Sequence, residues 1–316
     1  MYFPYLRGRQ NELIALRELI TNGRLSKKII PIVEPVKVTS TLINTLQTFI
    51  ENKKPIILIV NPSVGSFVTD LQLDKNTKLK EQFSSVEIKE SVLSGIIVNH
   101  RCSEEVSGLR KKNIPFDRMV AICMNNDNID YLLSAFSENN PKYCVIPYSP
   151  SFRRVRKGDR IMIDDKFNKL ARNNDYLLCE DEFFSDDHIY YSEDGYTGFS
   201  DFSIVGQDYY ESGFAPYAVA IHIVYPSEGE EKSLRIHHFV SDSNTDTSDP
   251  ANKFYEALTK LVKWNQEQKL NTLAIQKFNE MYEQQSYSGL GVIKRLSIMH
   301  HIEMVGTMLD EIEEQS

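Results

Sequence analysis

Polar or ionisable side chains follow nearly every short apolar run of this chain, at the point where a strand would end. In a barrel of parallel strands these ends meet at one face, so the side chains that follow them converge. This convergence predicts a binding or catalytic site. Asn61 and Asn99 are candidate ligand-binding residues, and for Asn61 the alternative is a structural role in a turn or helix cap. The residues at strand ends are Arg7, Glu34, Asn61, Asn99, Asn125, Tyr148, Glu180 and Asp181.

Glu34 is a candidate for acid–base chemistry. It lies in the sequence IVEPV, after an apolar run and before a proline, where a carboxylate has no capping role. Burial at the mouth of a barrel would raise its pKa and suit it to proton transfer. The alternative is an ion pair with Arg7 or Arg9 from the neighbouring strand.

Glu180 and Asp181 form a second acidic position. We expect them to face Glu34 across the ring of strands. Two opposed carboxylates can act as acid and base in a hydrolase, or hold a divalent metal through oxygen ligands. We take Glu34 and Glu180 as candidate catalytic residues and Asp181 as a candidate ligand-binding residue. Because the sequence does not fix their spacing, it assigns no metal and leaves the cofactor unknown.

His222 interrupts the apolar run 217–225, which we expect to be the last strand of the barrel. The preceding loop, which contains Asp201, would cover the site. His222 is then either a core histidine or, if it points inward, a catalytic base, with Asp201 as a ligand-binding residue beside it. The histidine pairs 237–238 and 300–301 lack metal-ligand spacing, because adjacent residues point to different sides of a strand or helix.

The charges of the chain predict a small anionic ligand rather than a nucleic acid. Arg7 and Arg9 are candidate ligand-binding residues that could hold an anionic group. The net charge of −8 argues against a general nucleic-acid-binding protein, which needs a clustered basic face. Five basic residues within 153–160 leave contact with nucleic-acid phosphates open, although a solvated loop is the preferred interpretation.

The elements that position these residues alternate between apolar β-type runs and helical patterns, which is typical of a parallel sheet. Several runs are continuously apolar (IIPIV, IILIV), as expected of strands covered by helices. Eight such runs predict a TIM-like (β/α)8 barrel, with an acidic insertion at 180–216 before strand eight. A doubly wound sheet is the rival, but the chain has no GxGxxG motif. The predicted strands are 2–6, 29–33, 56–60, 95–98, 119–123, 143–147, 176–179 and 217–224.

We expect residues 1–240 to form the barrel domain and residues 241–316 to form a helical segment that packs on the barrel or completes it. Helices are predicted at 250–268, 271–284 and 290–313, and Asp249 with Pro250 gives the first one a cap and a start.

The four cysteines lack CxxC spacing and are expected to be buried thiols of a reduced compartment. The N-terminus lacks a signal-peptide pattern, and no apolar run is long enough to span a membrane, which predicts a cytoplasmic protein without membrane contact.

The opening residues YFPYLRGRQNELIALREL resemble the Beta-protein family, first described from bacteriophage and widespread in bacteria. Members begin with a Tyr-x-Pro-x-Leu-basic-x-basic strand, followed by a glutamate and an Ala-Leu helix. The stretches IIPIVEP, FSDFSIVG and AVAIHIVY extend the resemblance to about residue 240. The resemblance implies a protein that acts with a partner encoded nearby, in mobile and phage-defence loci. The matching positions are Tyr2, Pro4, Leu6, Arg7, Arg9, Glu12, Ala15 and Leu16.

Two functional hypotheses follow. In the first, the chain is an anti-phage defence protein that recognises a partner protein through the loops at the barrel mouth and the C-terminal helices. In the second, it is a hydrolase of a small phosphorylated or glycosidic substrate, with carboxylates at the barrel mouth. The polar mouth residues serve either hypothesis, since a fold does not determine a function.

Overall fold

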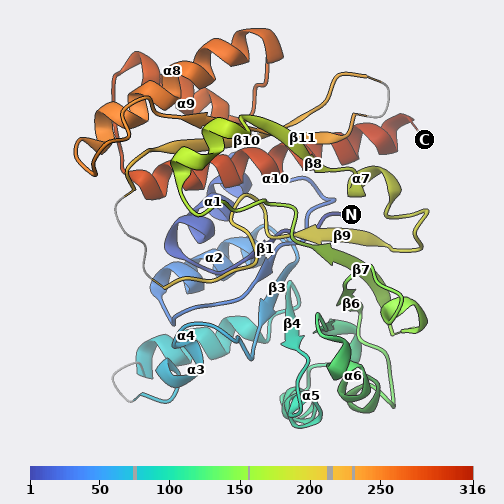
Figure 1. The fold of residues 1–316 in the computed structure, drawn as a ribbon. Helices are drawn as coiled ribbons and strands as arrows, with labels where there is room; N and C mark the ends of the chain where they lie inside the picture. The colour runs from blue at the N-terminus through green and yellow to red at the C-terminus, as the bar shows by residue number, and fades with distance from the viewer. Residues whose placement is uncertain (74–76, 156, 212–215, 230–231, 316) are drawn as a thin grey trace.

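The core of the fold is an eight-stranded parallel sheet that closes into a barrel (Figure 1). The computed structural model describes residues 1–73, 77–155, 157–211, 216–229 and 232–315. The strands follow one another around the ring in chain order. Their bounds are β1 Tyr5–Leu6, β2 Ile32–Val33, β3 Ile56–Ile59, β4 Val92–Ile97, β5 Met119–Ile122, β6 Tyr143–Ile146, β7 Asp159–Asp164 and β9 Gly198–Asp201.

The ring closes between its first and last strands. The backbone N–H of Phe3 donates to the carbonyl of Phe199 over 2.8 Å, and the N–H of Phe199 donates to the carbonyl of Met1 over 3.0 Å. Glycine is required at position 198, because a Cβ there would lie 2.6 Å from the Met1 carbonyl oxygen. The predicted (β/α)8 barrel is confirmed.

Helices follow the first five strands and cover the outside of the barrel. Helix α2 illustrates why they form: Leu42, Leu46 and Phe49 share its buried face, and the Thr39 hydroxyl caps it by accepting from the Leu42 N–H over 3.2 Å. The bounds are α1 Gln10–Thr21, α2 Ser40–Glu51, α3 Phe67–Asp70, α4 Thr77–Glu87, α5 Cys102–Lys111 and α6 Ile129–Ala135, with short 3₁₀ helices η2 Phe116–Arg118, η3 Asn126–Asn128 and η4 Phe152–Arg154.

The predicted seventh and eighth strands were wrong. Residues 176–179 overlap the 3₁₀ helix η5 Asn173–Leu178, and residues 217–224 belong to a different sheet. The barrel uses β7 and β9 instead. The sequence of β7, DRIMID, begins and ends with charged residues, and that of β9, GFSD, has no β-branched residue. Their place in the barrel comes from pairing with β6 and with the N-terminal strand rather than from local β propensity.

A second, three-stranded antiparallel sheet lies above the barrel in the order β10-β11-β8 (Figure 1). Its strands are β8 Asp181–Ser185, β10 Ala220–Pro226 and β11 Leu234–Val240, and the short helix α7 Asp187–Tyr190 follows β8. The apolar run that resembled a barrel strand is β10, which helices cover from the C-terminal part of the chain.

Three long helices complete the molecule and confirm the predicted C-terminal helices. They are α8 Pro250–Gln268, α9 Leu273–Glu283 and α10 Leu290–Gln315. The Asp249 side chain caps α8 at the Asn252 N–H over 3.1 Å, with Pro250 at the start of the helix. Helix α10 runs between the barrel and the α8–α9 layer (Figure 1), where it packs on α1, α9 and β10.

Helix α10 takes the place that follows the eighth barrel strand. It closely approaches the segment between α1 and β2 at Gly306, where a Cβ would lie 2.9 Å from the Cβ of Ser26. The Ser26 hydroxyl donates to the Asp310 carboxylate over 2.8 Å. The last helix of the C-terminal segment therefore covers the barrel. Strands β10 and β11 of the second sheet lie between β9 and these helices in the sequence, whereas β8 precedes β9.

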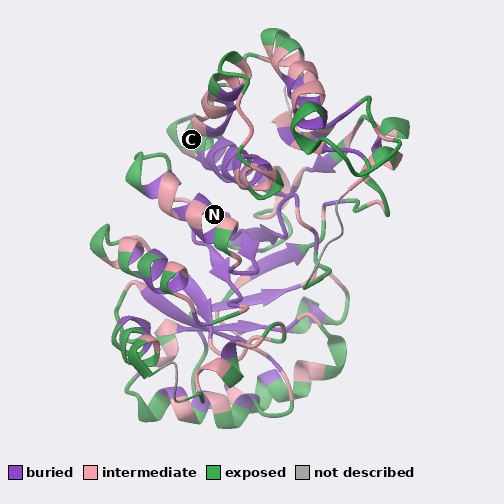
Figure 2. Ribbon diagram, turned by 90° about the vertical axis from the view of Figure 1, so that its left-hand side faces the viewer, coloured by how far each residue is buried: buried purple, intermediate pink, exposed green. Residues whose placement is uncertain are grey.

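Two buried cores hold the layers together. One fills the barrel interior with side chains such as Ile57, Ile59 and Val145, and the other lies between the strands and the helices. Figure 2 shows the strands and the inner faces of the helices as buried and the outer helix faces as exposed. No helix within the described residues combines the length and the apolar character that a membrane span needs.

Candidate functional site

The mouth of the barrel is closed by a buried network around Glu34. Its carboxylate accepts hydrogen bonds from the Tyr5 hydroxyl over 2.7 Å and from the backbone N–H and the hydroxyl of Ser63 over 2.7 and 2.8 Å. It also forms an ion pair with Arg7. A fully buried carboxylate with these donors has its acceptor sites occupied. The ion pair with Arg7, which was the alternative for Glu34, is confirmed.

Arg7 and Arg9 point to different places. The guanidinium of Arg7 lies 5.2 Å from the centre of the Tyr5 ring and 5.6 Å from that of Phe202, and it also donates to the Gln207 carbonyl. Arg9 donates to the Tyr210 carbonyl, and its guanidinium lies 4.8 Å from the centre of the Tyr209 ring. The two arginines therefore do not form a joint anion site.

Asn61 and Asn99 have structural roles. The side-chain amide of Asn61 donates to the Ile97 carbonyl and accepts from the Ile97 N–H, both over 2.8 Å. Asn99 accepts from the Arg101 N–H over 2.7 Å at the start of α5. Asn61 binds the backbone of the last residue of β4 and Asn99 binds the backbone just after β4, as turn and cap residues do.

Asp201 connects β9 to α10. Its carboxylate accepts from the Tyr2 hydroxyl over 2.7 Å and from the Ser203 N–H over 2.8 Å, and it lies 3.7 Å from Nε2 of His301. Burial raises the pKa of Asp201 to about 6 and lowers the pKa of His301 to about 3. All four residues are buried, and the carboxylate of Asp201 contacts the other three, while its role in ligand binding stays a prediction.

Glu180 and Asp181 are not at the barrel mouth, because they belong to the second sheet. Glu180 is exposed, and its backbone carbonyl accepts from the His238 N–H over 2.7 Å. Asp181 accepts from the Tyr225 hydroxyl over 2.6 Å and from Nε of Arg235 over 2.5 Å. The expected pair of carboxylates facing Glu34 across the mouth was wrong, since residues 176–179 are not a barrel strand.

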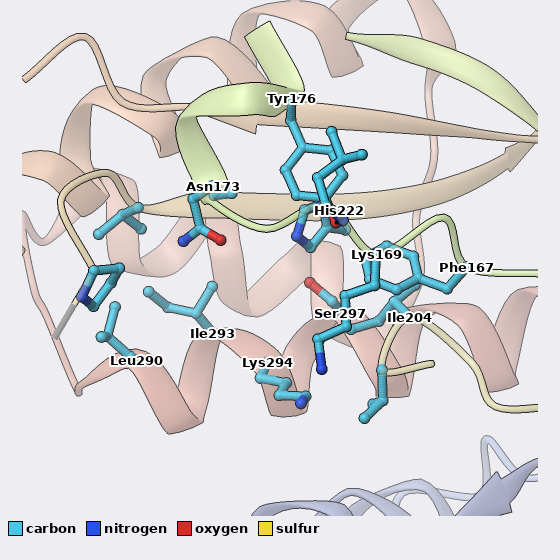
Figure 3. A pocket seen from close by; sticks show the side chains of 15 residues that line it. Phe167, Lys169, Asn173, Tyr176, Ile204, His222, Leu290, Ile293, Lys294 and Ser297 are labelled. Atoms are coloured by element: carbon cyan, nitrogen blue, oxygen red, sulfur yellow. Dashed lines mark hydrogen bonds between the residues drawn. The ribbon is translucent and has the colours of Figure 1, made fainter. Parts of the chain in front are cut away.

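A cavity with chemically useful groups lies between the loops after β7 and β9, the strand β10 and the helix α10 (Figure 3). We call it the His222–Lys294 cavity, and its volume is about 230 Å³. Its lining residues are Phe167, Lys169, Leu170, Asn173, Tyr176, Ile204, Val205, Pro216, Val219, Ala220, His222, Leu290, Ile293, Lys294 and Ser297.

The lining carries two lysines and no Asp or Glu among the described residues. Burial lowers the pKa of Lys294, Glu12 partly offsets this, and Arg9 and Lys169 lower the pKa further. Among the described residues, no carboxylate oxygen lies within 4.0 Å of the Lys294 amino group. The amino groups of Lys169 and Lys294 lie near each other in Figure 3, which makes one side of the cavity cationic.

The opposite side of the cavity carries His222, which the sequence had selected as a candidate. Its Nδ1 lies 2.7 Å from Nδ1 of His238, and Nε2 of His238 lies 3.3 Å from a carboxylate oxygen of Glu182. The rings of Tyr176 and Phe167 flank His222 at centroid distances of 4.8 and 5.2 Å. Burial lowers the pKa of His222 well below its usual value, and His238 and Lys294 contribute.

No cluster of three or more His, Cys, Asp or Glu side chains in the described part of the chain is placed to hold a metal ion. All four cysteines are free, and burial raises the pKa of Cys102, Cys123 and Cys144 to about 12. Their thiols are therefore protonated and packed, as the sequence predicted.

The basic run 153–160 does not act as one group. Lys157 donates to the Phe136 carbonyl over 2.8 Å and Arg160 to the Gly195 carbonyl over 2.5 Å. Arg153 and Arg154 are exposed, and Arg156 lies outside the described residues. Nucleic-acid binding stays a prediction that these contacts do not favour.

Comparison of the chain with protein-family models finds no match, and comparison with curated proteins finds none at a significant level. The resemblance of the N-terminal residues to the Beta-protein family therefore stays an expectation.

Lys294 and Ser297 were missed by the sequence analysis. A signal was present, because Leu290, Ile293, Lys294 and Ser297 recur at helical spacing on one face of α10. A lysine within such a face, next to buried apolar residues, is unusual. The sequence could not show that this face meets the loop after β7, which lies more than a hundred residues earlier.

Proposed function

We propose that this protein binds a small anionic molecule in the His222–Lys294 cavity. The observation that carries the proposal is the pair of lysines on its wall, with no lining carboxylate among the described residues, in a chain of net charge −8. Burial disfavours the charged form of Lys294 and Glu12 offsets this only in part, so an anionic ligand would stabilise the ammonium group further.

The place of the cavity in the fold supports the proposal. Barrels of this class bind ligands in the loops after their strands, and the loops after strands seven and eight often form phosphate sites. Here β7 and β9 are the seventh and eighth strands of the ring, and Lys169 and Ile204 follow them. Apolar side chains such as Phe167 and Ile293 cover the rest of the wall and suit the carbon skeleton of an organic anion.

The test is isothermal titration calorimetry with inorganic phosphate and pyrophosphate. Because Lys294 would contribute a charge-assisted hydrogen bond, Lys294→Met should weaken binding about tenfold. Lys263→Met is the matched control, since Lys263 is exposed on α8 and the charge change is the same. Equal affinities for all three proteins, or no binding by the wild type, would contradict the proposal.

A second proposal is recognition of a partner protein, which the family resemblance implies together with a role in phage defence. The supporting observation is β8, an edge strand that pairs only with β11 among the described strands, next to exposed apolar side chains of Leu178 and Phe183. Such an edge can accept an extended strand from a partner.

Co-expression of this chain with the protein encoded beside it should yield a complex. Phe183→Asp should weaken the complex, whereas Val68→Asp, an exposed control on α3, should not. A complex insensitive to Phe183→Asp would count against this surface.

A further inference from the structure

The hydrogen-bonded row Glu182–His238–His222 ends at the wall of the cavity. Glu182 and His238 come from β8 and β11 of the second sheet, and His222 comes from β10. The contacts are 3.3 Å between the Glu182 carboxylate and Nε2 of His238, and 2.7 Å between the two Nδ1 atoms. Each contact needs one hydrogen, and the chemistry of the three groups decides where each hydrogen lies.

A carboxylate can only accept, so Nε2 of His238 carries its proton toward Glu182. Burial lowers the pKa of His238 even though Glu182 raises it, so the ring is neutral near pH 7 and has a single N–H. Its Nδ1 is therefore an acceptor. The 2.7 Å contact then requires His222 to donate from Nδ1, which leaves Nε2 of His222 with a free lone pair.

We propose that Nε2 of His222 is a general base that takes a proton from the anionic ligand of the His222–Lys294 cavity. The inference rests on the proposed function, because Lys169 and Lys294 would bind the ligand from one wall of the cavity while His222 contacts it from the other. The ligand class is a small phosphate or carboxylate that also carries a hydroxyl or an acidic C–H group.

The proton that leaves the ligand is taken up by the hydrogen-bonded row of Glu182, His238 and His222. The ligand O–H or C–H bond breaks, its electron pair stays on the ligand, and the proton forms a bond to Nε2 of His222. The imidazolium of His222 then passes the Nδ1 proton to Nδ1 of His238, where Glu182 stabilises the charge. His238 and Glu182 are positioning residues, since they act through His222.

The groups around His222 set the strength of this base. Tyr176 and Phe167 pack on the ring from the segment after β7, His238 faces it from β11, and Lys294 disfavours its charged form from α10. An anion bound at Lys294 would offset that lysine. His222 should therefore accept a proton more readily in the occupied cavity than in the empty one.

The first measurement is the tautomer of each histidine, by long-range ¹H–¹⁵N NMR of the full chain labelled at histidine. His222 should carry its proton on Nδ1. His300 is an internal control of the opposite kind: it accepts from Thr272 at Nδ1 and donates from Nε2 to the Val224 carbonyl over 2.7 Å. In His238→Phe the preference of His222 for Nδ1–H should be lost. A wild-type His222 protonated on Nε2 would overturn the inference.

The second measurement is carbethoxylation by diethyl pyrocarbonate, followed by peptide mass spectrometry. A free Nε2 lone pair on the cavity wall should react, and inorganic phosphate should slow the reaction of His222 in the wild type but not in Lys294→Met. If phosphate binds but His222 does not react with diethyl pyrocarbonate, the role of His222 as a general base is overturned and the anion site is not. A reactive His222 that phosphate never protects would overturn the anion site, and the present inference with it.

Discussion

Glu34 shows at the scale of one residue how the same side chain supports two interpretations. A carboxylate after a barrel strand predicted acid–base chemistry, and its neighbour Arg7 predicted an ion pair. The structure buries Glu34 in an ion pair with Arg7, and Tyr5 and Ser63 also donate to its carboxylate. Tyr5 and Ser63 decide between acid–base chemistry and a structural ion pair, because they donate hydrogen bonds to Glu34. These are tertiary contacts that the local sequence does not encode.

Glu34→Gln should therefore destabilise the protein rather than remove a catalytic group. Breaking a buried ion pair leaves the charge of Arg7 without its partner, which costs about 3 kcal/mol of unfolding free energy. Urea denaturation measures this cost, and Glu90→Gln at an exposed position should cost almost nothing. A Glu34→Gln protein with wild-type stability would contradict the structural role.

The buried histidines predict a loss of stability in acid. Burial lowers the pKa of His300 from 6.5 to about 4. The unfolded chain takes up a proton below pH 6.5 and the folded chain does not until about pH 4, so stability is present above pH 6.5 and falls as the pH falls toward 4. His301, with a pKa of about 3, adds to the loss, and Asp201, whose pKa is raised to about 6, opposes it.

His300→Gln tests this dependence, because glutamine can still donate to the Val224 carbonyl but does not titrate. The slope of unfolding free energy between pH 4 and 6.5 should become shallower by up to about 1.4 kcal/mol per pH unit. His100→Gln is the matched control, since His100 is exposed. An unchanged slope for His300→Gln would show that His300 is not the group responsible.

At the scale of elements, the sequence predicted most of what local pattern can encode. The first six barrel strands and the C-terminal helices were predicted because continuous apolar runs and helical periodicity mark them. Strands β7 and β9 were missed, because their places depend on partners on both sides of the ring. The strand β10 was placed in the wrong sheet, since an apolar run does not tell which sheet it joins.

Helix α10 offers a prediction at this scale through its close contact with the barrel. Gly306→Ala should be destabilising by about 1–3 kcal/mol, because the new Cβ would lie 2.9 Å from the Cβ of Ser26. Gly108→Ala, in α5 with open space around it, should instead stabilise by up to about 1 kcal/mol. Thermal unfolding of the two variants compares them directly. A stabilising Gly306→Ala would contradict the packing of α10 against the barrel.

At the scale of the whole molecule, the candidate site exists because two layers meet. The barrel contributes the loops after β7 and β9, and the later part of the chain contributes β10 and α10. The sequence identified His222 but not Lys169, Lys294 or Ser297. Those residues come together in one cavity only when α10 lies across the barrel. Local periodicity does not specify which elements a helix face will cover.

We propose that the cavity between these layers binds an anion. The most direct measurement is a crystal structure of the protein grown with tungstate, a phosphate analogue whose anomalous scattering locates it without ambiguity. We expect a tungstate ion within hydrogen-bonding distance of the Lys294 amino group, with His222 across the cavity. An ion bound only outside this cavity, such as beside Arg9 and Lys37, or an empty cavity at saturating tungstate, would contradict it.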